Sequence, residues 1–418
     1  SRQHSCSYLC IGAFPLALPP CFGRMGAIGS CFGSCVGSCA SAGCCALMLS
    51  GSTGTPKASR CLLVWLQAFT ALLAVLLAWE PTSWLPKACD ALDWLGSSVG
   101  VCECRSALGP CWEDQLIYRA EAAVMLLYVG LMLLVVSGCG AGAAHAYPVL
   151  KFFVVFGATA AFLFLPNQLF SAFGFFSGIA SGVFLVIQTV PLIDFAYTWN
   201  ESWFSFGMGA RRVHFSSRGF NGWMAMIIVA SIFLLTCALS GIIHLYIVWP
   251  EVWWLVTSAM VISLALLVVS ITEWCEHGAL LTSSAVMAYS VWLCYEVVGA
   301  APSSSDDHAL AAVLKWVGII ISSCTLAAFA FMPSLGSTAA TEAALPIAEG
   351  DSATQDVSSA DFVVQCAVHA AASVYVASVL APCLNSATFV ARTVALFMSL
   401  ILYGWTLVAP KVLTSRAF

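Results

Sequence analysis

The stretch FGFFSGIASGVFLVIQTVPLIDFAYTWNESW, residues 173–203, decides the fold class. Its apolar part, 173–199, meets no charged residue before Asp194, and as a helix it is about 40 Å long. The hydrocarbon core of a bilayer is only about 30 Å thick, so such a helix must tilt or project beyond it. The stretch therefore predicts a long transmembrane helix that carries a costly ionisable group near its end.

The composition of the whole chain agrees with a membrane protein. Of the 418 residues, 61% are hydrophobic and 8% are charged, whereas about a quarter of the residues in soluble domains are charged. So few charges cannot cover the surface of a soluble protein of this length. The net charge of −5 provides no basic surface for nucleic acid, so we expect no nucleic-acid partner.

Ten apolar runs are long enough to cross a bilayer, which takes roughly 20 residues. The third run is short and ends at Pro166. We therefore expect an all-α polytopic membrane protein with about ten transmembrane helices. The runs are 61–79, 119–138, 149–165, 173–199, 222–248, 252–272, 280–300, 309–332, 362–381 and 392–410.

Lysine and arginine positions predict the orientation, because cytosolic loops are enriched in them. Ten spans with a cytosolic N-terminus place ten of these 15 residues on the cytosolic side and five on the other side. Both termini are therefore expected in the cytosol, in the endomembrane system or the plasma membrane. The lumenal five are Lys87, Arg105, Arg119, Lys315 and Arg392.

Four segments follow from this topology. A Cys-rich segment, 1–60, precedes spans one to eight, which occupy 61–332 and include a lumenal loop at 80–117. An acidic cytosolic loop, 333–361, has the composition of a mobile linker. The last two spans and the tail occupy 362–418.

Two groups stand out among the 20 cysteines of the chain. Cys31, Cys35 and Cys39 share one helical face and suit either palmitoylation or packing as small residues. The second group lies in the predicted lumenal loop, where an oxidising compartment favours disulfides. The sequence does not define which of these cysteines pair. It consists of Cys89, Cys102, Cys104 and Cys111.

Span four carries two patterns. Gly174, Gly178 and Gly182 form a row that lets another helix approach closely, or alternatively opens a groove for lipid headgroups. Further along, Asp194, Thr198 and Glu201 are spaced to lie on one helical face. They suit a polar furrow for headgroups or an ion, or alternatively a hydrated helix end.

Span seven places polar groups within the membrane. Tyr289 and Glu296 lie seven residues apart on one stripe, and we add both to the candidate furrow. A carboxylate at this depth should pair, become protonated or meet water. Lys315 and Arg392, by contrast, begin spans eight and ten and are expected to extend their side chains to the interface.

Motifs for catalysis and cofactors are absent from the sequence. It contains no P-loop and no HExxH motif, and its histidines lack metal-ligand spacing. We therefore expect no enzyme activity, no metal site and no cofactor.

The segment 192–203 resembles a signature of the serine incorporator, or TMS membrane protein, family. The ending WTLVAPKVLTSRAF, 405–418, is similar to the ending of that family, and so are Tyr118–Arg119, Ser283–Ser284 and 372–375 in their order along the chain. The resemblance implies ten helices in two subdomains braced by a long tilted helix, for which span four is the candidate. The stretch FVVQC, 362–366, departs from the pattern usual for the family.

The family resemblance implies support of phosphatidylserine and sphingolipid synthesis and ATP-independent lipid scrambling. Our leading hypothesis is a lipid-handling protein whose partners are membrane phospholipids. Alternatives are a carrier for serine or another small polar solute, and an accessory subunit of a larger membrane complex. A homo-oligomer is also compatible with the sequence.

Overall fold

The chain folds into helices that match the predicted spans. The computed structural model describes residues 56–77, 89–90, 102, 111–139, 148–213, 217–272, 280–300, 316–326, 351–381 and 386–412, and no strand occurs among them. The Cys-rich segment before residue 56, with Cys31, Cys35 and Cys39, lies outside these ranges. Helices are expected here because a lipid-exposed backbone must satisfy its own hydrogen bonds.

The helices are bounded as follows. They are α3 (Pro56–Leu77), α5 (Cys111–Leu134), the π-helix η2 (Val135–Cys139), α7 (Pro148–Phe162), α8 (Asn167–Val213), α9 (Ser217–Val248), the 3-10 helix η3 (Pro250–Val252), α10 (Trp253–Ile271), α11 (Leu280–Val298), α14 (Asp351–Leu380) and α15 (Ser386–Val412), with a short helix at Trp316–Leu326.

Seven of the described helices are long and apolar enough to cross a membrane. Three shorter apolar helices, Leu63–Ala74, Leu150–Phe162 and Trp316–Leu326, fall within the other three predicted spans. The prediction of an all-α polytopic membrane protein is confirmed.

Several helices begin earlier than the apolar runs indicated. Helix α5 begins at Cys111 rather than at 119, and α15 begins at Ser386 rather than at Arg392. Helix α14 begins at Asp351, so residues 351–361 are helical and are not part of a linker. The apolar criterion stops at charged or polar residues, whereas a helix continues through them wherever its backbone remains hydrogen-bonded.

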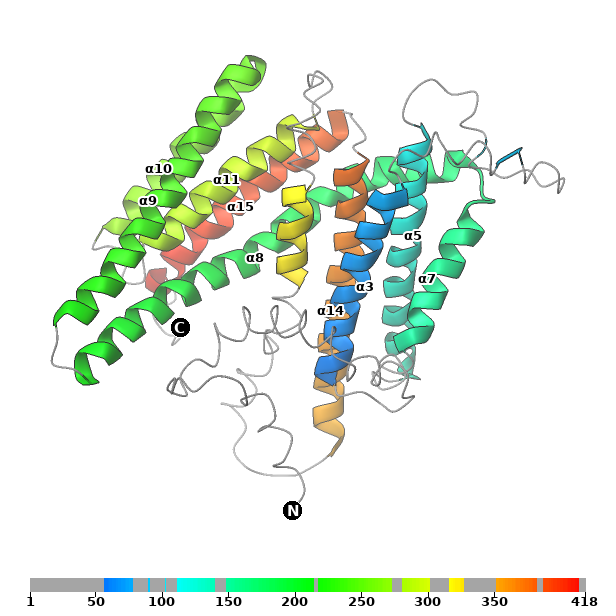
Figure 1. Cartoon of the computed structure of the whole chain (residues 1–418), viewed down its shortest axis with the longest axis horizontal. Coiled ribbons are helices and arrows are strands. Elements are labelled where there is room, and N and C mark those ends of the chain that lie inside the picture. Colours follow the sequence, from blue (N-terminus) through cyan, green and yellow to red (C-terminus); the bar gives the residue numbers. More distant parts are fainter. Residues whose placement is uncertain are drawn as a thin grey trace.

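Helix α8 connects two groups of helices (Figure 1). The first bundle consists of α3, α5, α7 and α14, and the second bundle consists of α9, α10, α11 and α15. Helix α8 is 47 residues long, packs against α5 and α14 of the first bundle, and packs against α9, α11 and α15 of the second. It runs diagonally past both bundles, as a brace does.

The start of α8 is set by a proline. Helix α7 ends at Phe162, and the amides of Leu163, Phe164 and Leu165 donate to carbonyls three residues back, which tightens the chain into a turn. Pro166 follows, and a proline disfavours helical geometry in the residue before it. Helix α8 then begins at Asn167.

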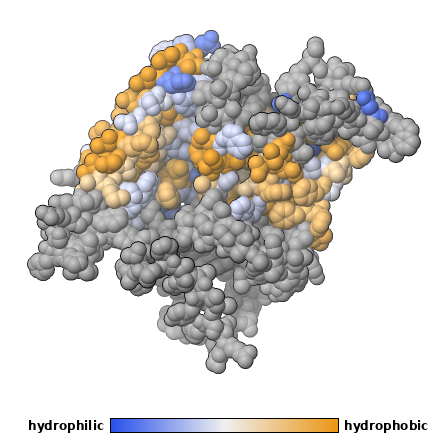
Figure 2. Space-filling view, viewed as in Figure 1, coloured by the Kyte–Doolittle hydropathy of each residue, from blue (hydrophilic) through white to orange (hydrophobic). Residues whose placement is uncertain are grey.

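Lipid-facing and central helices differ in their burial. In the membrane-spanning windows of α11 and α14, 78% of the residues are buried, against 22% in α9. Outward-facing apolar side chains such as Phe153, Ile247 and Ile401 are largely exposed, and apolar surface covers helices of both bundles (Figure 2). Such a surface suits a hydrocarbon solvent, because soluble monomers rarely expose large apolar patches. Polar side chains on α11 and α14 are therefore held inside the protein.

Candidate functional site

A buried ion pair lies where the two bundles meet. Arg392 on α15 and Glu296 on α11 approach to 3.0 Å, with side chains that are 4% and 5% exposed. Arg392 also donates to the backbone carbonyl of Glu296 at 2.8 Å. A buried charge is costly unless it is paired and hydrogen-bonded, and this pair meets both conditions. Glu296 thus pairs, which is one of the three outcomes expected for it.

The expectation for Arg392 was wrong. Its side chain does not extend to an interface but is buried, because α15 begins at Ser386 and places Arg392 nearly two turns inside the helix. The sequence does hold a signal for this: Thr388, Arg392, Ser399 and Tyr403 recur at spacings of four and seven residues. Such a polar stripe on one face indicates a face turned toward protein rather than lipid.

The ion pair reaches the first bundle and the brace. Arg392 donates to the backbone carbonyl of Ser378 on α14 at 3.3 Å and to its hydroxyl at 2.5 Å, and to the hydroxyl of Ser181 on α8 at 3.3 Å. Tyr375 on α14 donates to a carboxylate oxygen of Glu296 at 3.3 Å. A single arginine therefore links helices of both bundles to α8.

The same face of α8 carries further polar groups. Gln188 and Thr189 are fully buried, and the hydroxyl of Thr189 hydrogen-bonds that of Ser399 on α15 at 2.7 Å. Both amide atoms of Gln188 lack a hydrogen-bond partner among the described residues. We name this set the polar seam. It comprises Ser181, Gln188, Thr189, Glu296, Ser378, Arg392 and Ser399.

The glycine row brings other helices close to α8. A Cβ added at Gly174 would lie 2.5 Å from the ring of Tyr118 on α5. One at Gly182 would lie 2.8 Å from the backbone oxygen of Ala391 on α15, and Gly178 faces Thr388 of the same helix. Neighbouring helices thus occupy the space beside the row, as helix packing requires.

The five residues of the predicted furrow do not form one site. Asp194 and Glu201 are exposed and Thr198 is half-buried, next to the tilted ring pair of Phe195 and Trp199. Tyr289 and Glu296 instead face the interior. Tyr289 donates to the carbonyl of Leu185, which lies nine residues before Asp194, or about 13 Å along the axis of α8. Asp194, Thr198 and Glu201 therefore lie toward the end of α8, apart from Tyr289 and Glu296, and only Glu296 belongs to the polar seam.

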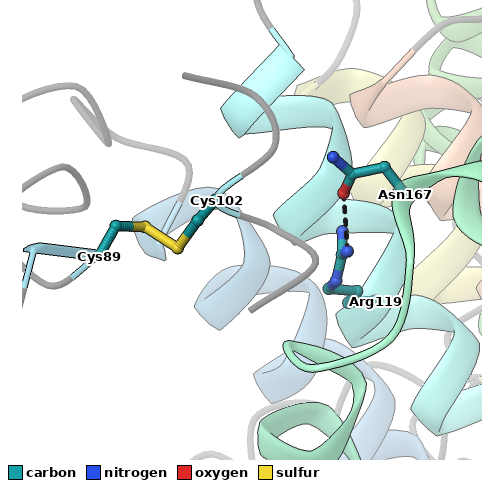
Figure 3. Close-up of a disulfide and its surroundings, with 4 residues drawn as sticks. All are labelled: Cys89, Cys102, Arg119 and Asn167. Carbon is teal, nitrogen blue, oxygen red and sulfur yellow. Dashed lines mark hydrogen bonds between the residues drawn. A yellow bond between two sulfur atoms is a disulfide. The ribbon is translucent and has the colours of Figure 1, made fainter. Parts of the chain in front are cut away.

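The loop between α3 and α5 contains a disulfide between Cys89 and Cys102 (Figure 3). Cys104 and the side chain of Cys111 lie outside the described part of the chain. Near this loop, Arg119 on α5 is fully buried. It donates to the carbonyls of Phe162 and Leu165 and to the side chain of Asn167, and so fixes the α7–α8 turn to α5.

Comparison with known proteins agrees with this architecture. The sequence model of the family described as Serine incorporator (Serinc) matches residues 30–375. The chain belongs to the serine incorporator family. The match includes α8 and Glu296 and ends at Tyr375, before Arg392.

Individual serine incorporators are similar over parts of their length. Serine incorporator 2 of Bos taurus is 35% identical over 128 residues, which cover 28% of this chain and 27% of that protein. A probable serine incorporator of Dictyostelium discoideum is 25% identical over 285 residues, covering 61% of this chain and 63% of that protein. Serine incorporator 3 of Bos taurus is 23% identical over 256 residues, covering 57% and 51%. The matches thus span less than two thirds of these relatives.

Proposed function

We propose that this serine incorporator lets phospholipid headgroups cross the membrane between its two helix bundles, without ATP. The observation that carries the proposal is the polar seam, which lies between the bundles along the brace. A headgroup needs polar partners along its path, whereas its acyl tails can stay in lipid. Serine, threonine and glutamine side chains beside an ion pair offer such partners when the bundles part.

The ion pair suits both charges of a headgroup. Arg392 can exchange its carboxylate partner for a phosphate, because a guanidinium binds both in the same forked geometry. Glu296 can then accept a headgroup amine. The sequence contains no P-loop for ATP, so we expect lipid to move down its gradient. We also expect this movement of lipid to support the synthesis of serine-derived lipids.

The disulfide supports the proposed orientation. Disulfides persist in oxidising compartments, and Cys89 and Cys102 lie in the loop that the lysine and arginine distribution assigns to the lumen. We therefore place both termini in the cytosol, in a membrane of the endomembrane system or the plasma membrane.

The test is a scrambling assay with the full chain in phosphatidylcholine vesicles that carry a fluorescent phospholipid. Dithionite quenches only the outer leaflet of sealed vesicles, so scrambling exposes the remaining fluorescence. We expect faster loss than in protein-free vesicles. An unchanged inner-leaflet signal with folded protein refutes the proposal, and gradient-dependent uptake of labelled serine without scrambling indicates the carrier instead.

Two glutamines provide a matched pair of variants. Gln188 in the seam and Gln365 on α14 are both buried, and neither side chain has a hydrogen-bond partner among the described residues. Gln188→Leu should slow scrambling roughly tenfold, the effect of raising a barrier by about 1.4 kcal/mol. Gln365→Leu should leave the rate unchanged. Equal rates for both variants argue against the seam as the path.

One observation favours an accessory subunit as the second candidate. The groups that face Arg392 satisfy its hydrogen-bond donors, so the seam is closed. The small cavity lined by Ser263, Ser290 and Cys294 lies elsewhere, among α9, α10 and α11. A closed seam of this kind suits a structural tie. Stoichiometric co-purification with other membrane proteins in mild detergent, combined with no scrambling, supports this role.

A further inference from the structure

The first bundle contains a second buried carboxylate whose surroundings differ from those of Glu296. Glu121 on α5 is fully buried, and the amide nitrogen of Gln67 on α3 donates to its Oε2 at 3.4 Å. Its other oxygen, Oε1, has no hydrogen-bond partner among the described residues, and neither does the amide oxygen of Gln67. Two buried acceptor atoms thus remain unsatisfied on two side chains that already touch each other.

Two cations of the first bundle have described side chains, and both are directed elsewhere. Arg119 donates to Gln115 and to groups in the turn between α7 and α8. Lys151 on α7 is buried near Cys366 on α14. Neither forms an ion pair with Glu121.

The other titratable groups nearby are not cationic partners either. Tyr128, two turns along α5, donates to the carbonyl of Leu63. Its ring stacks on His369 of α14 at 4.8 Å between centroids, and the Nδ1 atom of His369 has no partner among the described residues. On α3, Thr70 donates to carbonyls of its own helix. An ionised Glu121 would therefore be an uncompensated charge inside the membrane, which is strongly disfavoured.

One proton removes both defects. A carboxylate only accepts hydrogen bonds, whereas a carboxylic acid also donates one. With a hydrogen on Oε1, Glu121 donates to the amide oxygen of Gln67 while the Gln67 amide donates to Oε2, which gives a reciprocal acid–amide pair. We propose that Glu121 and Gln67 form a proton-binding site in the first bundle, with the proton held on the Glu121 carboxyl group.

The chain thus holds two buried carboxylates in opposite states. Glu296 is ionised against Arg392, and Glu121 is neutral against Gln67. Were α3 to part from α5 and admit water, the O–H bond of Glu121 would break and the proton would pass to water. Binding of the proton is therefore coupled to closure of α3 onto α5.

Infrared spectroscopy of the purified full-length protein tests this site, because a protonated carboxylic acid absorbs at higher frequency than a carboxylate. At neutral pH we expect an acid band that shifts in heavy water. Glu121→Gln, which mimics the neutral acid in shape and charge, should remove the band, and Glu296→Gln should leave it in place. An absent band, or one that persists in Glu121→Gln, overturns the proposal.

Two further measurements keep the test decisive if Glu121→Gln folds poorly. Gln67→Leu should move the acid band to higher frequency, because the carbonyl loses its hydrogen bond; an unmoved band refutes the pairing. Thermal unfolding of the wild type in sodium chloride and in choline chloride should coincide. Stabilisation by sodium alone that is absent in Gln67→Leu shows that the site holds a metal cation instead of a proton.

Discussion

At the scale of single residues, Arg392 is held entirely by groups from other parts of the protein. Its guanidinium contacts Glu296, Ser378 and Ser181, which come from three other helices. Removing one member of a buried pair leaves the other charge uncompensated. We expect Arg392→Met to lower the free energy of unfolding by about 3–5 kcal/mol, measured by denaturant unfolding in detergent.

The double variant Arg392→Met with Glu296→Leu should recover much of this loss, because it removes both charges together. Asp194→Asn is the control, since that carboxylate is exposed and should change stability by no more than about 0.5 kcal/mol. Wild-type stability in Arg392→Met speaks against the ion pair as a tie between helices.

At the scale of helices, the glycine row allows α8 and α15 to touch. A Cβ at Gly182 would lie 2.8 Å from the backbone oxygen of Ala391, and backbone cannot move aside as a side chain can. We therefore expect Gly182→Ala to destabilise the protein by about 1–3 kcal/mol. Gly157 on α7 has nothing within 4 Å of such a Cβ, so Gly157→Ala should be neutral or stabilising by up to about 1 kcal/mol. Equal midpoints of thermal unfolding for the two variants contradict this account.

The positions of the helices could be predicted from the sequence, whereas the pairing of residues between helices could not. All ten predicted spans contain helix, because the length and apolarity of a span are local properties. The partner of Glu296 could not be found in this way, since Arg392 lies 96 residues further along the chain and appears in the sequence as the charged end of an apolar run. The pairing of Glu121 with Gln67 likewise needs the packing of α3 on α5, because the two residues are 54 positions apart in the sequence.

At the scale of the whole molecule, the brace and the seam make the two bundles depend on each other. Helix α8 packs along both bundles, and Arg392 adds polar contacts to α8 and α14 at the same junction. The exposed residues Asp194 and Glu201 lie outside this junction, which explains why a furrow predicted from spacing on a single helix did not assemble. Spacing places residues on one face of a helix, but only tertiary packing decides whether that face turns inward.

The topology of the whole chain predicts on which side of the membrane the termini and the disulfide lie. If all ten predicted spans cross the membrane, both termini lie on one side, and the excess of lysine and arginine predicts that this side is the cytosol. In intact cells with the protein at the surface, terminal tags should react with antibody only after permeabilisation. After mild reduction, Cys89 and Cys102 should react with an impermeant thiol reagent from outside, and Cys89→Ser with Cys102→Ser should abolish that labelling. A C-terminal tag that reacts without permeabilisation contradicts ten crossings with a cytosolic N-terminus, because it places the end of α15 on the same side as the disulfide.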